Sequence, residues 1–232
     1  MRFKDVFSII GPVMVGPSSS HTAGAARIGR SARHLYGKQP EKAVIIFYGS
    51  FAATYQGHGT DRAIVGGLLD YDTDDSRIPM ALDYAKQSGL EVSFEEGRGI
   101  VRHPNTAKLI LSDRDGGSEL TMTGISIGGG NIEIIEINGF NIKMTGIYPT
   151  LVIQHYDSPG VLAYVTQALS LEGTNIAHMS VDRKNRSGNA ITVVEIDGEI
   201  KEGILERIAQ MDALISVGII DLSQETQTEE QK

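Results

Sequence analysis

The sequence has 232 residues, of which 41% are hydrophobic and 22% charged, and its formal net charge at pH 7 is -8. This composition predicts a packed globular protein of one or two domains. The acidic balance argues against nonspecific nucleic-acid binding, which needs a basic surface. Because the sequence contains no cysteine, it excludes disulfide bonds and a thiolate-bound metal cluster held by this chain alone.

The amino-terminal stretch 1–17 contains one short apolar segment interrupted by glycine and proline. It lacks the pattern of a signal peptide, and no run reaches the ~18 apolar residues of a membrane-spanning helix. We therefore expect a cytoplasmic protein with neither a membrane nor a nucleic-acid partner.

Residues 1–148 predict a domain in which helices come first and strands follow. The segment 3–10 predicts a short helix. After a loop rich in Gly, Pro and Ser, apolar residues at helical spacing predict a helix that ends at Gly37. The residues on that helical face are Ala25, Ile28, Ala32 and Leu35. Further helices are expected around 64–71 and 78–87, and strands at 42–48, 91–96, 107–113, 119–127, 131–137 and 140–144, with Asn138-Gly139 as a hairpin turn.

A domain boundary is predicted at 146–150, where Pro149 separates two apolar stretches. Residues 149–222 then predict the order β-α-β-β-α-β, which is the ferredoxin-like split motif. Ser158 is expected to cap the first helix, with Pro159 at its first position. The tail 223–232 has no apolar residue and is expected to be disordered. The fold class is therefore α+β, with two domains.

The segment GPSSSHTAG, from Gly16 to Gly24, places hydroxyl groups and an imidazole directly before a predicted helix. Unpaired backbone N–H groups and the helix dipole favour anions there, and hydroxyls add donors. Gly24 would let a ligand or a partner's backbone come close. The candidate residues are Ser18, Ser19, Ser20, His21 and Thr22. An ordinary helix cap explains part of this pattern, so both interpretations stay open.

A second segment, GHGTD (Gly57 to Asp61), places His58 between two glycines at the predicted start of a helix. An exposed imidazole has a pKa near ~6.5 and suits proton transfer. Thr60 or Asp61 is expected to cap the helix. Taken alone, this segment is also explained by a capped helix with an incidental histidine.

Other segments give weaker indications. The run Gly128 to Gly130 follows a strand and predicts a flexible turn or a close backbone approach. Asp72, Asp74 and Asp75 better fit a solvated loop or a helix cap than a metal site. Asp157, Ser158 and Gly160 lie between a strand and a helix, where backbone N–H groups could bind a small zwitterion.

Three segments occur in the order found in iron–sulfur L-serine dehydratases: GPSSSHTAG (16–24), YGSFAATYQGHGTD (48–61) and SIGGG (126–130). The chain therefore resembles the beta subunit of that family. The second domain resembles an ACT domain. The first also resembles the allosteric substrate-binding domain of certain phosphoglycerate dehydrogenases. The resemblance covers nearly the whole chain apart from the acidic tail.

The resemblance implies that L-serine is converted to pyruvate and ammonia by a complex whose alpha subunit holds a 4Fe-4S cluster on its cysteines. It implies that His58 is the acid/base group, oriented by Thr60 and Asp61. His21, Thr22 and Ser18 to Ser20 would face the partner's cluster and help to hold the substrate. Dependence on a monovalent cation and an ACT-mediated homo-oligomer are further expectations.

Two departures from the family pattern concern Ala25 and Ala26, where single-chain relatives often have Pro and Met, and Gly59, where some have a second histidine. Two other functions remain as alternatives. One is an amino-acid-binding regulatory module that senses serine for a partner enzyme. The other is a self-sufficient hydrolase that uses His and Ser.

Overall fold

The structure is a computed structural model that describes residues 13–185 and 188–223. The helix expected at 3–10 lies outside the described residues, as does all of the expected disordered tail except Ser223. The helical elements are η1 (Ser19–Ala23, π-helical), α2 (Gly24–Tyr36), α3 (Gly49–Thr54), α4 (Thr60–Leu68), η2 (Ile78–Met80, 3₁₀), α5 (Ala81–Gln87), α6 (Val161–Leu171) and α7 (Glu202–Ala209).

The strands form two sheets. The first sheet has the order β2-β1-β3-β4-β5-β6, with β1 and β2 parallel and every other pair antiparallel. The second has the order β10-β7-β9-β8 and is antiparallel throughout. The strands are β1 (Lys42–Tyr48), β2 (Glu91–Glu96), β3 (Asn105–Ser112), β4 (Glu119–Gly128), β5 (Asn131–Ile137), β6 (Phe140–Met144), β7 (Thr150–Tyr156), β8 (Asn175–Arg183), β9 (Asn189–Asp197) and β10 (Leu214–Ile220).

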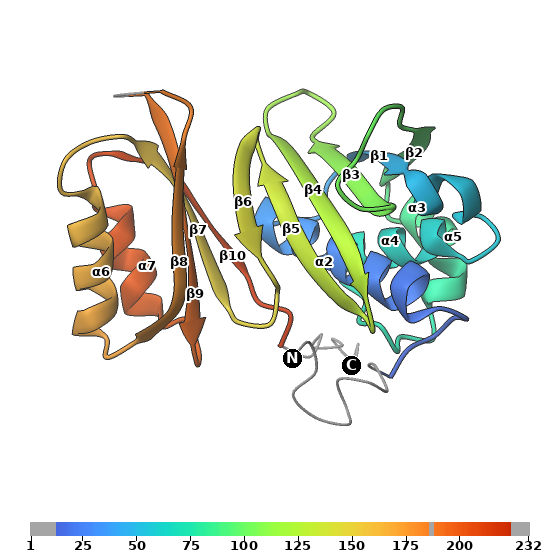
Figure 1. Ribbon diagram of the computed structural model, residues 1–232, viewed down its shortest axis with the longest axis horizontal. Coiled ribbons are helices and arrows are strands. Elements are labelled where there is room, and N and C mark those ends of the chain that lie inside the picture. The colour runs from blue at the N-terminus through green and yellow to red at the C-terminus, as the bar shows by residue number, and fades with distance from the viewer. Residues whose placement is uncertain (1–12, 186–187, 224–232) are drawn as a thin grey trace.

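The α+β fold class and the β-α-β-β-α-β order of the second half are confirmed. Figure 1 shows α6 and α7 on the outer left face of the second sheet, while the first sheet and α2 lie on its other side. An apolar core joins α6 and α7 to their sheet. The other face of that sheet contributes Val152, Ile191, Val193 and Ile220 to the large core of the first half. The two halves therefore share buried apolar contacts.

The helix predicted to end at Gly37 does so. Gly37 has a φ of 80° and its amide donates to the carbonyls of Arg33 and His34, as in a typical glycine C-cap. The Asn138-Gly139 turn is also confirmed: both residues have positive φ, and β5 and β6 pair across them. Local turn chemistry decided these features, so the sequence was sufficient to predict them.

Three helix starts differ from expectation. Gly59 (φ 68°), not Thr60 or Asp61, is the N-cap of α4, and Gly160 (φ 92°), not Ser158, is the N-cap of α6, which begins at Val161. In both cases a glycine in the left-handed conformation leads the chain into the helix, and no side chain caps the helix start. The first turn of the helix expected at 78–87 is 3₁₀.

The short helix α3 was not predicted. Its first amides, those of Ser50 and Phe51, donate to the carbonyl oxygen of Pro104 at 2.7 and 3.3 Å. Gly49 precedes them with a φ of 56°, and a Cβ at this position would lie 2.6 Å from the same oxygen. Because this turn is held by a loop that is distant in the sequence, no local sequence pattern predicts it.

Helices α2 and α4 cross with their backbones in direct contact. A Cβ on Gly29 would lie 2.1 Å from the carbonyl oxygen of Ile64, and one on Gly67 would lie 2.1 Å from that of Ala26. Only glycine fits at either position, since real Cβ atoms do not approach a heavy atom within 3.0 Å. The crossing places the beginnings of the two helices side by side (Figure 1).

We expect Gly67→Ala to destabilise the protein. Overpacking of this kind costs ~1–3 kcal/mol, which exceeds the ~1 kcal/mol by which alanine favours a helix over glycine. The measurement is the urea midpoint of unfolding. Gly66→Ala is the matched control, because its Cβ would meet the side chain of Ile78 at 3.2 Å and not a backbone. Equal midpoints for the two variants would contradict the close crossing.

Candidate functional site

The structure brings the two histidine segments together. His21 lies in η1, which runs directly into α2, and His58 lies two residues before α4. Their ring centroids are 4.8 Å apart and the rings are inclined by 77°. The hydroxyl of Thr22 donates to the carbonyl oxygen of His58 at 3.4 Å. Two segments more than thirty residues apart in the sequence therefore form one surface.

The serines before His21 have different roles. Ser18 caps η1: its Oγ accepts from the amide of His21 at 3.1 Å and lies 3.4 Å from Nδ1 of that ring. Ser19 and Ser20 are half-buried, and their hydroxyls have no hydrogen-bond partner among residues 13–185 and 188–223. Capping therefore explains Ser18 and leaves two hydroxyls available to a ligand. A π-helical turn such as η1 is frequently found at functional sites.

His21 is half-buried and held on two sides. Its Nε2 lies 3.1 Å from the Oγ of Ser50, and its ring meets Phe51 edge-on with centroids 5.2 Å apart. Burial lowers the pKa of His21 below its usual value, and the neighbouring His58 lowers that pKa further. Since burial disfavours the charged form, His21 is neutral at pH 7.

His58 is exposed, and its imidazole has no hydrogen bond within the described chain. Its position is set through the backbone, because its amide donates to the carbonyl of Thr54 at 3.0 Å. An exposed, unpaired imidazole beside a neutral one can accept a proton from a ligand or return one.

Thr60 and Asp61 lie beneath the surface at the start of α4. The Oγ1 of Thr60 is buried and has no partner within the described chain. Asp61 accepts from the amide of Arg62 at 2.9 Å, and burial raises the pKa of its carboxyl. No hydrogen bond in the described residues joins either side chain to His58, so no direct contact supports the expectation that they orient it.

The SIGGG turn, residues 126–130, lies beside the serine segment of the same site. Gly128, Gly129 and Gly130 all have positive φ, and a Cβ on Gly128 would lie 3.9 Å from the Oγ of Ser20. The space opposite Gly24 was expected to admit a ligand or a partner's backbone. It is filled by this chain's Ser126, whose Oγ would lie 2.1 Å from a Cβ on Gly24. That expectation was wrong, because the sheet supplies the close neighbour.

Sequence reasoning missed two residues of this region. Ser50 falls inside the segment 48–61 but was not singled out, although it contacts His21. Asn105 begins β3 and donates from Nδ2 to the carbonyl of Ser126 at 3.4 Å. Nothing in the sequence around Asn105 indicates this contact, which depends on the pairing of β3 with β4.

The arginines and aspartates near α2 form structural ion pairs. Arg30 is buried and bonds to Asp70 and Asp72 at 2.9 and 3.0 Å. In the aspartate group 72, 74 and 75, Asp72 pairs with Arg30 and Asp75 pairs with Arg77, so two of the three carboxylates have a cationic partner in this chain.

Within the described residues, no group of three His, Cys, Asp or Glu side chains could hold a metal. With no cysteine, this donor set does not fit an iron–sulfur cluster.

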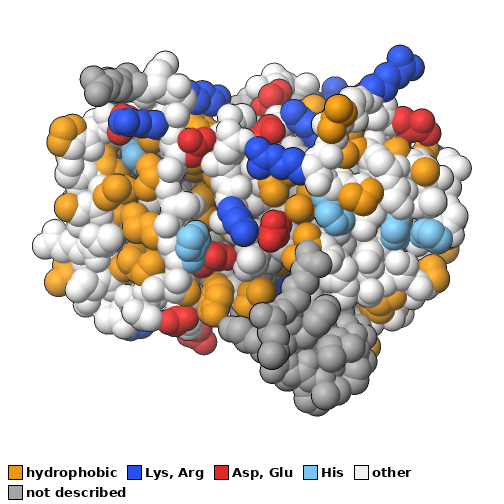
Figure 2. Space-filling model, in the orientation of Figure 1, with side chains coloured by type: hydrophobic (Ala, Val, Ile, Leu, Met, Phe, Trp, Pro, Cys, Tyr) orange, Lys and Arg blue, Asp and Glu red, His pale blue; other side chains and the backbone are white. Residues whose placement is uncertain are grey.

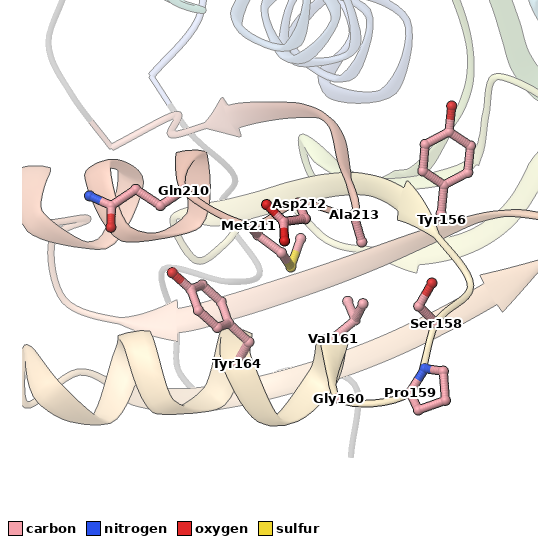
Figure 3. A pocket seen from close by; sticks show the side chains of 10 residues that line it. All are labelled: Tyr156, Ser158, Pro159, Gly160, Val161, Tyr164, Gln210, Met211, Asp212 and Ala213. Carbon is pink, nitrogen blue, oxygen red and sulfur yellow. The ribbon is translucent and has the colours of Figure 1, made fainter.

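A separate hollow of about 650 Å³ opens at one end of the second sheet. It lies between the loop entering α6 and the loop from α7 to β10. Figure 3 shows Tyr164 and Asp212 beside it, with Ser158 at its rim and Tyr156 directed away from α6. Ser158 and Gly160 were expected here. Asp157 was expected too, but it pairs with Arg183 at 3.0 Å, and Asp212 is the carboxylate that lines the hollow.

A family model and two near-full-length relatives point to the same family. Residues 3–136 match the family model described as serine dehydratase beta chain. The chain is 49% identical to the probable L-serine dehydratase, beta chain, of Bacillus subtilis, over 94% of this chain and 98% of the relative. It is 38% identical to the L-serine dehydratase, beta chain, of Peptoniphilus asaccharolyticus, over 96% and 100%.

A D-3-phosphoglycerate dehydrogenase of Bacillus subtilis is 30% identical over 80% of this chain but only 35% of the relative. No helix in the described part of the chain is long and apolar enough to cross a membrane.

We expect His58→Ala to raise the pKa of His21, because the variant removes the positive charge that opposes protonation of the neighbouring ring. Burial of His21 remains, so its pKa should stay below that of an exposed histidine. NMR titration of the His21 ring protons measures this. His178→Ala, on the exposed part of β8, is the control and should leave the titration unchanged. An unaltered or lower His21 pKa in the first variant would refute the coupling.

Proposed function

This chain belongs to the serine dehydratase beta chain family, and we propose that it is one half of an L-serine ammonia-lyase that forms pyruvate and ammonia together with an alpha chain. The observation that carries the proposal is the surface pair His21–His58, assembled from two segments that resemble those of the family. An exposed imidazole beside a neutral one suits abstraction of a proton next to a carboxylate.

We place the 4Fe-4S cluster on the alpha chain. The absence of cysteine and of any three-ligand group among the described residues supports this assignment. Such a cluster, when bound, supplies a Lewis acid for the hydroxyl of the substrate. The histidine surface of this chain would then be completed only in the complex.

The residues of this chain hold the substrate and move a proton. In our proposal an unprotonated ring nitrogen of His58 accepts the α-proton of L-serine and passes a proton to the departing hydroxyl, which leaves as water. The resulting aminoacrylate takes up water and hydrolyses to pyruvate and ammonia. Burial lowers the pKa of His21, so we assign the proton transfer to His58 and not to His21. The free hydroxyls of Ser19 and Ser20 donate to the substrate carboxylate. Thr60 and Asp61 are buried in the first turn of α4, so we assign them a structural role there.

The hollow beside α6 supports a second role as an amino-acid effector site, in what we propose is an ACT domain. Backbone N–H groups at the start of α6 are unpaired by any side-chain cap and suit a carboxylate. The carboxylate of Asp212, across the hollow, suits an ammonium group. A small zwitterion such as serine would satisfy both ends. This observation favours regulation in addition to catalysis.

We expect His58→Ala to lower the turnover of the reconstituted alpha–beta complex by ~10²-fold or more, since loss of a general base typically costs 10²–10⁴. Serine-dependent pyruvate formation is the assay. Gel filtration should show that the complex still assembles. His178→Ala should retain activity. Near-normal turnover of an assembled His58→Ala complex would refute the assignment of the base and favour a purely regulatory site.

For the effector site, we expect Asp212→Asn to weaken binding of L-serine by ~10-fold or more, because a charge-assisted hydrogen bond contributes about 1.5–3 kcal/mol. Isothermal titration calorimetry of the isolated beta chain measures this binding. Glu199→Gln changes the same charge at an exposed site outside the hollow and should bind normally. Equal affinities in the two variants would remove Asp212 from the site.

A further inference from the structure

The loop 97–104 between β2 and β3 exposes an unusual set of side chains. Ile100 has a relative exposure of 105%, which is that of a free side chain, and it stands between the exposed Arg98 and Arg102. Within residues 13–185 and 188–223, neither guanidinium pairs with a carboxylate. Arginine is enriched at protein interfaces, and a fully exposed isoleucine loses its contact with water when a partner covers it.

Both ends of the loop are held firmly. The amide of Gly97 donates to the carbonyl of Phe47 at 2.8 Å, and a Cβ on Gly97 would lie 2.2 Å from the ring of Tyr48, so only glycine fits. At the other end, the carbonyl of Pro104 accepts from the amide of Ser50 at 2.7 Å. The tip is therefore presented on a fixed base, which lowers the entropic cost of binding.

The loop is continuous with the histidine surface. Ser50, whose amide is held by Pro104, has its hydroxyl 3.1 Å from Nε2 of His21. One residue thus separates the base of the loop from the proposed active site. A partner at the two histidines would therefore lie next to the base of the loop.

A hollow of about 400 Å³ lies under the loop, on the face of the first sheet that carries Lys108. Arg98, Arg102 and Lys108 line it, against the single carboxylate of Glu136, which lies 3.8 Å from Lys108. The local charge is positive, although the whole chain carries -8. Figure 2 shows Lys and Arg side chains with hydrophobic groups between them on the upper part of this half of the molecule.

We infer that loop 97–104 and the hollow beneath it form the docking surface for the alpha chain, and that the alpha chain meets it with an acidic segment carrying an apolar side chain. The inference rests on the proposed function, because that function requires an alpha chain at the adjacent histidines. Positive charge around the loop would speed association, and Ile100 would be buried in the complex.

The test measures the affinity of purified full-length beta chain for purified alpha chain by biolayer interferometry. The double variant Arg98→Glu/Arg102→Glu should weaken binding by ~10-fold or more, mainly at low ionic strength, since salt screens such attraction. Ile100→Asp should weaken binding by ~10-fold or more and keep much of that effect at high salt, because it loses apolar burial in addition to adding a negative charge. All variants lie in an exposed loop, and unchanged thermal unfolding confirms that they fold.

The controls carry the same changes elsewhere. Lys42→Glu/Lys86→Glu reverses two exposed lysines away from the loop, and Leu171→Asp changes an exposed leucine on α6. Both controls should bind normally. If wild-type beta chain binds the alpha chain and the loop variants bind equally well, the docking inference is overturned and the proposed function stands. If wild-type chain does not bind the alpha chain, the proposed function itself fails.

Discussion

The contact between the backbones of α2 and α4 is the constraint on which the candidate site depends. At Gly29 and Gly67 no Cβ could be accommodated. Because η1 continues into α2, and His58 immediately precedes the cap of α4, this crossing fixes the separation of the two histidines. Moving either helix outward by the width of a methyl group would separate the imidazoles. The site is thus positioned by packing several residues away from it.

Helix α2 also joins the site to the second sheet. Its amino-terminal end carries the histidine surface, while its carboxyl-terminal end packs on β10, where a Cβ on Gly218 would lie 2.7 Å from the side chain of Leu35. The amide of Asp221 lies 3.4 Å from Nδ1 of His34, whose other nitrogen bonds to Asp70 at 2.8 Å. A single rigid helix therefore connects the half that carries the proposed effector hollow to the half that carries the histidines.

In the proposed function, the histidine surface is completed by another chain. Burial and the neighbouring His58 lower the pKa of His21, and we assign proton transfer to the exposed His58. Within the described residues the hydroxyls of Ser19 and Ser20 have no hydrogen-bond partner, and the cysteine-free chain supplies no thiolate ligand for a cluster. The positively charged loop 97–104 stands next to this incomplete surface, attached to it through Ser50.

The sequence by itself determined the features that depend on neighbouring residues: the α+β class, the β-α-β-β-α-β order of elements in the second half, the glycine end of α2, and the Asn138-Gly139 turn. The order of the motifs also indicated the family, and the motifs contain both histidines. Only the tertiary structure decided that His21 and His58 touch, that Ser126 occupies the space at Gly24, and that Ser50 reaches His21. It also placed Asp212, and not Asp157, in the hollow beside α6. These contacts join residues far apart in the chain, and they follow from helix crossing and strand register, which no local pattern specifies.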